Sequence, residues 1–260
     1  AAVLQALGSL LPRRRRPTAG AVVRPWRDDA LRSYPARGLT PPRLFSFLQS
    51  ADAGQPQLMF ELFEDMLTRW PRLAAVAATR RLALTGLEWE LVPAESPDTA
   101  LAVATADHCR AVLQQLDRFR PALDHLASAL GHGLAVAELV WEDGRLVDLV
   151  PVPHSRLIAD PHEPWRLCVR TEQEPALGVP LDAQPHKWLV HQPRPRPGRP
   201  FDGGLLRASA LLFLAQSLSL RDWLSYTQIA GTPMRIAQYE PGLSDHDKQR
   251  LLRMLVSLGS

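Results

Sequence analysis

The amino-acid sequence predicts an α+β protein that is mainly helical and carries a small mixed or antiparallel sheet. Helical periodicity dominates the first half of the chain, short strand-like segments follow, and a long apolar helix comes next. Separate runs of helices and strands are typical of the α+β class, because a parallel α/β sheet would require the two to alternate. The 260 residues suffice for one large or two small domains. The sequence starts at Ala1 rather than at a methionine and ends within a predicted helix, so we expect a fragment of a longer protein.

Residues 1–40 predict a flexible basic arm, with four consecutive arginines from Arg13 to Arg16 among scattered proline and glycine. Nine arginines and two aspartates fall within residues 1–43, which leaves 21 basic and 25 acidic groups in the remainder. The net charge of +3 therefore belongs to the arm and not to the body of the protein.

Three helices are predicted next, over residues 41–52, 58–70 and 71–84. Prolines 41, 42 and 71 suit the first turn of a helix, where no backbone donor is needed. Within residues 58–70 the apolar side chains follow the i, i+3, i+4, i+7 rule and acidic side chains fall opposite. We therefore expect Glu61 and Asp65 on a solvated face rather than as a catalytic carboxylate pair.

The middle of the chain predicts strands together with two further helices, over residues 98–116 and 121–130. LEWELV, residues 87–92, alternates apolar and acidic side chains and predicts a half-buried strand. Residues 134–152 predict a β-hairpin that turns at Asp143 and Gly144, a favoured turn pair. Shorter strands are expected to complete one small sheet, at residues 156–160, 165–171 and 187–192.

PRPRPGRP, residues 193–200, predicts an exposed loop, because proline has no backbone donor for a sheet. A long helix over residues 204–229, a strand over 234–239 and a last helix over 248–258 follow, and Ser244 and Asp247 have the spacing of a capping box. We divide the chain into four parts: a basic arm (1–40), a wing-like α+β domain (41–192), a Pro/Arg-rich loop (193–202) and a helical region with one strand (203–260).

No segment predicts a membrane span or a secretory signal. The longest apolar stretch, residues 208–220, has 13 residues and is too short to cross a bilayer. The apolar start precedes the arginine run, whereas a signal peptide places its positive charge first. Cys109 and Cys168 lie 59 positions apart and form neither a disulfide framework nor a zinc motif, so a reducing compartment is expected. Cys109 shares the apolar stripe of its helix and is expected in the core.

The sequence contains no motif that specifies an enzyme, a cofactor or a metal site. The glycine-rich nucleotide-binding patterns, the GxSxG nucleophile elbow and the HExxH zinc motif are absent. His125 and His132 lie too far apart along one helix to bind a single ion, and we expect them on a solvated or subunit-facing surface. The later histidines, from His154 to His191, show no spacing that indicates a cluster. We therefore predict no catalytic residue, no metal and no cofactor.

Arginines are the stronger binding candidates, because a guanidinium group contacts phosphate through charge and paired hydrogen bonds. The candidate DNA contacts are Arg13, Arg14, Arg15 and Arg16 in the arm and Arg194, Arg196 and Arg199 in the proline-rich loop. The competing interpretation is a solvated tail and loop, because no aromatic residues are interleaved among these arginines.

The stretch RDWLSYTQIAGTPMRI, residues 221–236, predicts a structural joint at the end of the long helix. Trp223 and Tyr226 fall on one side of this helix and are expected to anchor it to the core. Gly231 is expected to supply a left-handed cap, and Pro233 to prevent the helix from continuing. An anion site at Gly231 is disfavoured, because the C-terminal end of a helix is partially negative.

Arg207 and Arg221 fall on the opposite side of the same helix, which predicts that they face solvent or a neighbouring subunit. We expect Trp223→Ala to destabilise the fold, and Arg221→Ala to spare the monomer while it impairs assembly.

Several motifs, in order along the chain, resemble the Mu-like phage portal family, once catalogued as a domain of unknown function. They are GGLLR (203–207), RDW (221–223), GTPMRI (231–236), and YEPG (239–242) followed by SDHDKQRLLRMLVSLGS. Upstream, ELFEDMLTRWPRLAAVAATRRLALTGLEWELVPA and LASALGHGLAVAELVWE are similar to the same family, so the resemblance runs from about Leu39 to the end. The sequence departs at Trp70, Pro71 and Arg72, where relatives often have an acidic residue, proline and histidine. The chain resembles about the first half of a family member.

The resemblance implies a non-enzymatic subunit of a homo-oligomeric ring, commonly a dodecamer, at one capsid vertex of a tailed phage or prophage. Such a ring is a conduit for DNA packaging and ejection and a head-tail connector. The implied partners are other copies of the subunit, a terminase large subunit, capsid and head-tail joining proteins, and double-stranded DNA, with no membrane. The implied location is the virion, after assembly in the bacterial cytoplasm. The mild negative charge of the body agrees with a conduit that does not hold DNA tightly.

Two alternatives stay open on the sequence. The first is a sequence-nonspecific nucleic-acid-binding protein that uses the arginine-rich arm, for which deletion of residues 1–40 would abolish DNA binding. The second is an unrecognised hydrolase with a histidine or carboxylate site.

Overall fold

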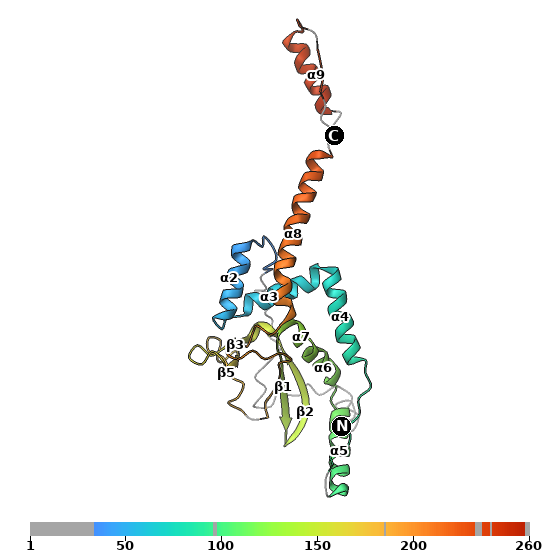
Figure 1. Ribbon diagram of the computed structural model, residues 1–260, viewed down its shortest axis with the longest axis vertical. Coiled ribbons are helices and arrows are strands. Elements are labelled where there is room, and N and C mark those ends of the chain that lie inside the picture. Colours follow the sequence, from blue (N-terminus) through green and yellow to red (C-terminus); the bar gives the residue numbers. More distant parts are fainter. Residues whose placement is uncertain (1–33, 96–97, 185, 232–235, 240, 258–260) are drawn as a thin grey trace, which may run out of the picture. The chain divides into compact units, whose positions relative to one another are not determined.

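Helices and two small antiparallel sheets make up the chain, as seen in a computed structural model that describes residues 34–95, 98–184, 186–231, 236–239 and 241–257 (Figure 1). The predicted α+β class is confirmed. In chain order the elements are α2 (Pro41–Asp52), α3 (Gln57–Arg69), α4 (Pro71–Thr85), α5 (Thr99–Gln114), α6 (Phe119–Ala127), α7 (Ala129–His132), β1 (Ala135–Glu142), β2 (Arg145–Val152), the 3-10 helix η2 (His154–Arg156), β3 (Leu157–Ala159), β4 (Leu167–Val169), β5 (Val179–Pro180), β6 (Trp188–His191), α8 (Leu205–Ala230) and α9 (Asp245–Ser257).

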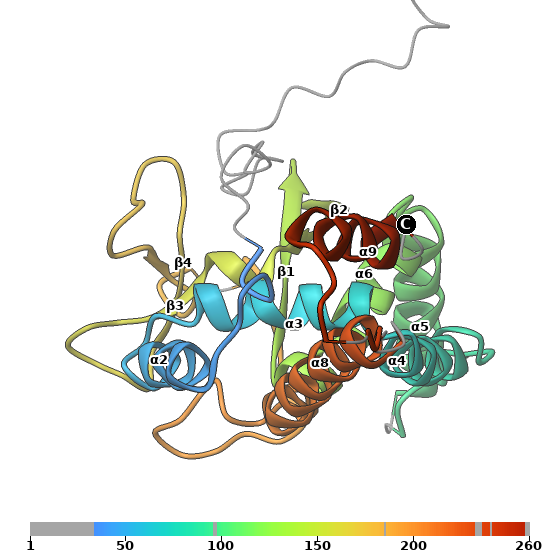
Figure 2. The ribbon, with the colours of Figure 1, turned by 90° about the horizontal axis from the view of Figure 1, so that it is seen from above.

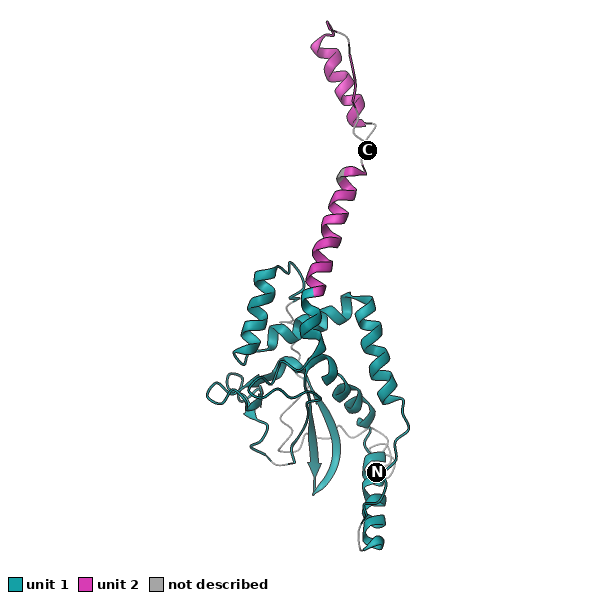
Figure 3. Ribbon diagram, in the orientation of Figure 1, with its two compact units in different colours: residues 1–211 teal, residues 212–260 magenta. Residues whose placement is uncertain are grey.

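The chain divides into two compact units, residues 1–211 and 212–260, with the boundary inside α8 (Figure 3). The first unit holds the elements from α2 to β6 and the start of α8, and the second holds the rest of α8 and α9. Within the described residues, no helix combines the length and the apolar character that crossing a bilayer demands.

The hydrophobic core of the first unit is built around α3. Its apolar positions repeat with helical spacing, and Leu62, Phe63 and Met66 are fully buried. Helix α2 lies beside α3 and adds Leu44 and Phe47 to the core (Figure 2).

Asp65 corrects the expectation of a solvated acidic face on α3. Its side chain is buried, with an exposed fraction of 1%, and its Oδ2 accepts the backbone N–H of Ala36 at 3.1 Å. The segment before α2 therefore packs on α3 and buries the Asp65 carboxylate. The helical periodicity of α3 alone had predicted that this carboxylate is solvated. Glu61 is half-buried and accepts a hydrogen bond from Gln57 at 3.1 Å.

The predicted hairpin of β1 and β2 is confirmed, with its turn at Asp143 and Gly144. Both residues have positive φ, 48° and 73°, as the tight turn between twisted strands requires. Strand β6 pairs with the other edge of β1, so the first sheet has the order β2-β1-β6. Strands β3, β4 and β5 form a second sheet, which corrects the prediction of a single one.

Helix α6 covers one face of the β1–β2 hairpin (Figure 1). Leu116, Ala122 and Leu149 form a buried cluster at this contact. Ala122 is the residue of α6 in the cluster, and Leu149 is the residue of β2. On β1, the fully buried Glu138 pairs with Nζ of Lys187 at 2.8 Å. Because successive strand residues point to opposite faces, this ion pair lies on the other face of β1 from Leu139, which packs against the cluster.

Three local predictions fail for lack of tertiary partners. Residues 87–92 are irregular and mostly exposed rather than a strand, and they pair with neither sheet. Trp89 instead lies 5.2 Å from the ring of Phe119, between centroids. Cys109 is exposed and not in the core. Residues 236–239 of the predicted last strand have no strand structure, and its first two residues lie outside the described ranges.

Two glycine contacts position the end of α7 against the start of α8. Gly133 closes α7 with φ of 98°, the left-handed conformation that favours glycine at a helix end. A Cβ on Gly204 would lie 2.6 Å from the backbone carbon of His132 and 2.7 Å from the nitrogen of Gly133. Only the absence of a side chain allows this close backbone approach.

We expect Gly204→Ala to lower the free energy of unfolding by about 3 kcal/mol, because the added methyl group forces two backbone segments apart. Chemical denaturation measures this change. Gly198→Ala is the control, since Gly198 has φ of 70° but nothing within 4 Å of an added Cβ, and backbone strain alone should cost about 1 kcal/mol. Equal losses in both variants would show that the approach of α7 to α8 is not the constraint.

Candidate functional site: a buried histidine stack

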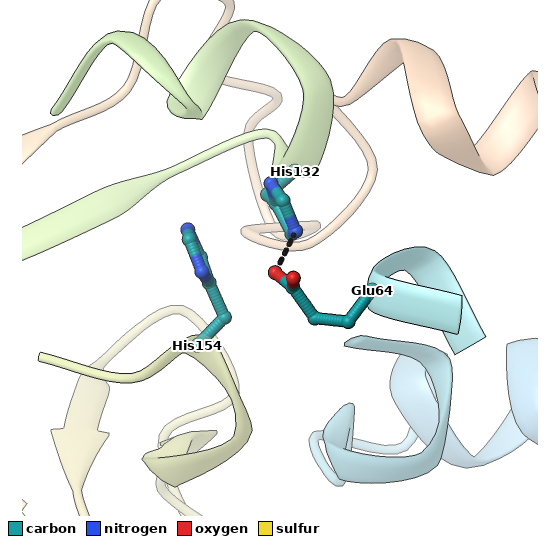
Figure 4. A group of neighbouring side chains, drawn as sticks. All are labelled: Glu64, His132 and His154. Carbon is teal, nitrogen blue, oxygen red and sulfur yellow. Dashed lines mark hydrogen bonds and ion pairs between the residues drawn. The ribbon is translucent and has the colours of Figure 1, made fainter. Parts of the chain in front are cut away.

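Three histidines from three elements meet in the first unit and form what we call the histidine stack. His125 lies on α6, His132 ends α7 and His154 opens η2, directly after β2. Their order in the stack is His125, His154, His132, with centroid distances of 4.9 Å and 3.9 Å between successive rings. Glu64 of α3 approaches the edge of His132, whose ring is nearly parallel to that of His154 (Figure 4).

Aromatic side chains of α3 pack against two rings of the stack. Phe60 lies 6.0 Å from His132 and 5.5 Å from His154, and Phe63 lies 5.9 Å from His132, between ring centroids. His132 is buried, with an exposed fraction of 2%, and His154 is also buried. The surroundings are therefore of low polarity, in which an added charge is costly.

Both ring nitrogens of His132 lie within hydrogen-bond distance of an oxygen atom. Nδ1 of His132 lies 3.2 Å from the carbonyl oxygen of Ser128, and Nε2 lies 3.1 Å from Oε1 of Glu64. Both partners are oxygen atoms, so the His132 ring is held between the end of α6 and helix α3.

Burial favours the neutral form of His154 and of His125. Burial lowers the pKa of His154 well below 6.5, the ordinary value, and the neighbouring His132 and His125 lower it further. Burial also lowers the pKa of His125, again with a contribution from His132. A charge on one ring of the stack thus disfavours a second charge on the ring beside it.

The geometry does not suit one metal ion shared by the two stacked rings. Ligand atoms of Glu64, His132 and His154 lie within 4.8 Å of one another, and histidine with carboxylate is a common zinc donor set. An imidazole lone pair lies in the ring plane, and the His132 and His154 planes are nearly parallel, at 12°. An ion in the plane of one ring is out of the plane of the other, far from the Zn–N distance of about 2.0–2.1 Å.

Sequence reasoning missed this site. It placed His125 and His132 on a solvated or subunit-facing surface, which is wrong because the helix breaks at Ser128 and α7 turns His132 inward. It also treated His154 only together with later histidines. The helix break could have been predicted from the sequence, because Ser128, Gly131 and Gly133 interrupt the apolar periodicity within six residues.

Arg207 is not a free interface residue within this chain. Its guanidinium pairs with Asp52 at 2.7 Å and with Asp202 at 3.0 Å, and 19% of its side chain is exposed. Arg207 is therefore partly buried within this chain, and its proposed interface role stays a prediction. Arg221 is exposed and pairs with the adjacent Asp222 at 2.8 Å, and its proposed interface role stays a prediction.

Trp223 and Tyr226 do not anchor α8 to the core of this chain. Their exposed fractions are 62% and 68%, so the anchoring prediction is wrong, because helical phase does not reveal which face is covered. Gly231 follows α8 but does not have positive φ, so it is not the predicted left-handed cap. Pro233 lies outside the described residues.

The loop arginines Arg194, Arg196 and Arg199 are exposed, and Arg199 pairs with Asp202 at 3.5 Å. Arg13, Arg14, Arg15 and Arg16 lie outside the described residues. A DNA contact by any of these arginines stays a prediction.

Comparison with known proteins defines the class as phage portal proteins. Residues 60–260 match the family described as portal protein of Mu bacteriophage. The match covers well over half of the chain, which therefore belongs to the Mu portal family.

Two curated relatives agree with this assignment. The portal protein of Escherichia phage Mu is 28% identical over 234 residues, which cover 87% of this chain and 44% of that protein. The Mu-like prophage FluMu protein gp29 of Haemophilus influenzae is 27% identical with the same coverage. The chain therefore spans less than half the length of these relatives.

Among solved structures, the chain is similar to a HK97 family phage portal protein from Corynebacterium diphtheriae. The identity is 18%, the TM-score is 0.29, and the match covers 73% of this chain and 60% of the other. A TM-score of 0.29 is too low to define a shared fold.

Proposed function

We propose that the full-length protein is a structural subunit of a homo-oligomeric portal ring at the capsid vertex of a Mu-like phage or prophage. Membership in the Mu portal family is the observation that carries this proposal. The ring, a dodecamer in this proposal, acts as a conduit for DNA packaging and ejection and as the head-tail connector. The family match lends no support to the alternative of a nucleic-acid-binding protein that uses the arginine-rich arm.

The proposed subunit has no enzymatic role of its own, because a terminase large subunit supplies the motor for DNA movement. Its other proposed partners are capsid and head-tail joining proteins and the double-stranded DNA inside the ring. The proposed location is the virion, after assembly in the bacterial cytoplasm. In this organisation, residues 41–192 form the wing-like domain and residues 203–260 lead into the helical region.

Exposed apolar surface supports a subunit that is covered by partners in its assembled state. Leu220, Trp223 and Leu224 lie at i, i+3 and i+4 on α8, and all three are exposed. Helix α4 has no buried residue and exposes Val76 and Leu82. Contiguous exposed apolar surface marks an interaction site more often than a solvated face.

We expect Trp223→Ala to change the free energy of unfolding by no more than about 0.5 kcal/mol and to weaken assembly, because the indole is exposed in the chain. Analytical ultracentrifugation of the full-length protein measures the assembly, and thermal unfolding of the same samples measures the fold. Arg221→Ala is expected to show the same pattern.

The test of the proposed function is the mass of the wild-type full-length protein in this experiment. A single sedimentation boundary with the mass of many subunits, which shifts toward the monomer mass in the Trp223 variant, supports the proposal. A wild-type protein that stays monomeric at all concentrations contradicts the ring, and a destabilised monomer of Trp223→Ala contradicts the exposed position of this side chain.

A further inference from the structure

The histidine stack joins four elements that are far apart in the sequence. Glu64 and His132 are 68 positions apart, and His154 contacts Ser128 across 26 positions, with 3.3 Å between His154 Nε2 and Ser128 Oγ. Nε2 of His125 lies 3.1 Å from the carbonyl oxygen of Val136 on β1. Helices α3, α6, α7 and η2 therefore meet at one group of ionisable rings.

We propose that the histidine stack is a pH-sensitive contact that holds α3, α6, α7 and η2 together at neutral pH and weakens in mild acid. Among the described residues, Glu64 is the one carboxylate that the stack engages, so it can offset the charge of at most one imidazolium. A second imidazolium would lie directly against the first, with 3.9 Å between the ring centroids of His132 and His154. Like charges at this distance repel strongly where water is excluded.

The charged groups that face the stack are few. Glu64 of α3 acts on both His132 and His125, and the three histidines act on one another. On the same elements, Asp65 accepts the Ala36 N–H and Asp124 pairs with Arg81 at 3.4 Å. Arg156 of η2 is also buried, two positions after His154. Glu64 is therefore the one carboxylate that the stack itself engages among the described residues.

The direction of the pH effect follows from the lowered pKa values of His154 and His125. In the unfolded chain each histidine takes up a proton near 6.5, whereas in the folded chain these two stay neutral to lower pH. The unfolded state then binds more protons, so stability is complete above 6.5 and falls as the pH falls below it.

Denaturant unfolding of the chain between pH 7.5 and 5.5 tests the proposal, and this range keeps most carboxylates ionised. One histidine that stays neutral in the folded state raises the unfolding equilibrium constant by about tenfold over this range. We expect at least this rise for the wild type. His154→Phe keeps an aromatic ring in the stack and removes the proton site, so we expect the dependence to weaken by about tenfold.

His125→Phe serves as a second variant in case His154→Phe does not fold, and it is expected to weaken the dependence as well. His108→Phe is the matched control, because His108 is exposed on α5, and it should keep the wild-type dependence. Side-chain ¹⁵N NMR of the folded wild type reports directly whether His154 is neutral at pH 6.

The proposal stands if the wild-type dependence is present, both stack variants weaken it and the control does not. A wild-type equilibrium constant that is flat between pH 7.5 and 5.5 overturns it. So does a pH dependence that persists unchanged in His154→Phe, or a His154 ring that becomes protonated at the ordinary pKa. These outcomes do not depend on whether the full-length protein forms a ring.

Discussion

Replacing Lys187 with methionine is expected to lower the free energy of unfolding by about 3–5 kcal/mol, the range measured when one partner of a buried ion pair is removed. Glu138 lies in the middle of β1 with no exposed surface, and its carboxylate is 2.8 Å from the Lys187 ammonium. Without that cation, the folded state must bury a carboxylate that has lost its ion pair, or neutralise it by protonation. Urea denaturation at pH 7.5 measures the loss.

The chain supplies a matched control, because Lys187 and Lys248 are its two lysines. Lys248 is exposed and pairs with Asp245, so Lys248→Met should change the stability by no more than about 0.5 kcal/mol. The double variant Lys187→Met, Glu138→Leu should regain most of the stability, since an apolar pair of similar volume often replaces a buried ion pair without cost. Equal effects of the two lysine variants would refute the buried pair.

Phe63→Ala is the second large expected effect, a loss of about 3–5 kcal/mol, because removing a fully buried ring leaves a cavity in the core. Phe63 packs against Phe60 with 6.1 Å between ring centroids and against His132 with 5.9 Å. The variant therefore also opens one side of the histidine stack. Thermal or urea unfolding measures the loss.

Phe45→Ala is the control for this variant, because Phe45 lies on the neighbouring helix α2 with an exposed fraction of 56%. It is expected to change the free energy of unfolding by less than about 1 kcal/mol. A loss as large as that of Phe63→Ala would mean that the core is not centred on α3.

Local signals in the sequence were enough to predict many elements. Proline at 41 and 71 marked the starts of α2 and α4, and Asp143 with Gly144 marked the hairpin turn. Ser244 and Asp247 cap α9 as predicted, with the Asp247 N–H donated to Ser244 Oγ at 3.2 Å. Each of these features depends on residues a few positions apart, so a short stretch of sequence is enough to predict it.

The failures all required knowledge of distant partners. Residues 87–92 alternate as a strand does, but a strand also needs an adjacent strand to complete its hydrogen bonds. Helical phase placed Trp223 and Arg221 on opposite faces without showing which face is covered. The histidine stack could not be predicted from local sequence either, because Glu64 and His132 are 68 positions apart in the chain.

The family assignment did follow from the sequence, because it depended on the order of several motifs over most of the chain rather than on a single site. The family match over residues 60–260 confirms it. The proposed function, a ring subunit, would need surfaces rather than a catalytic centre, and a search for catalytic motifs gives little guidance to a function of that kind.

Negative-stain electron microscopy of the full-length protein tests the proposed portal function most directly. We expect ring-shaped particles with a central channel and a constant number of subunits. Particles that stay monomeric or globular at every concentration, with no rings, would contradict the proposal.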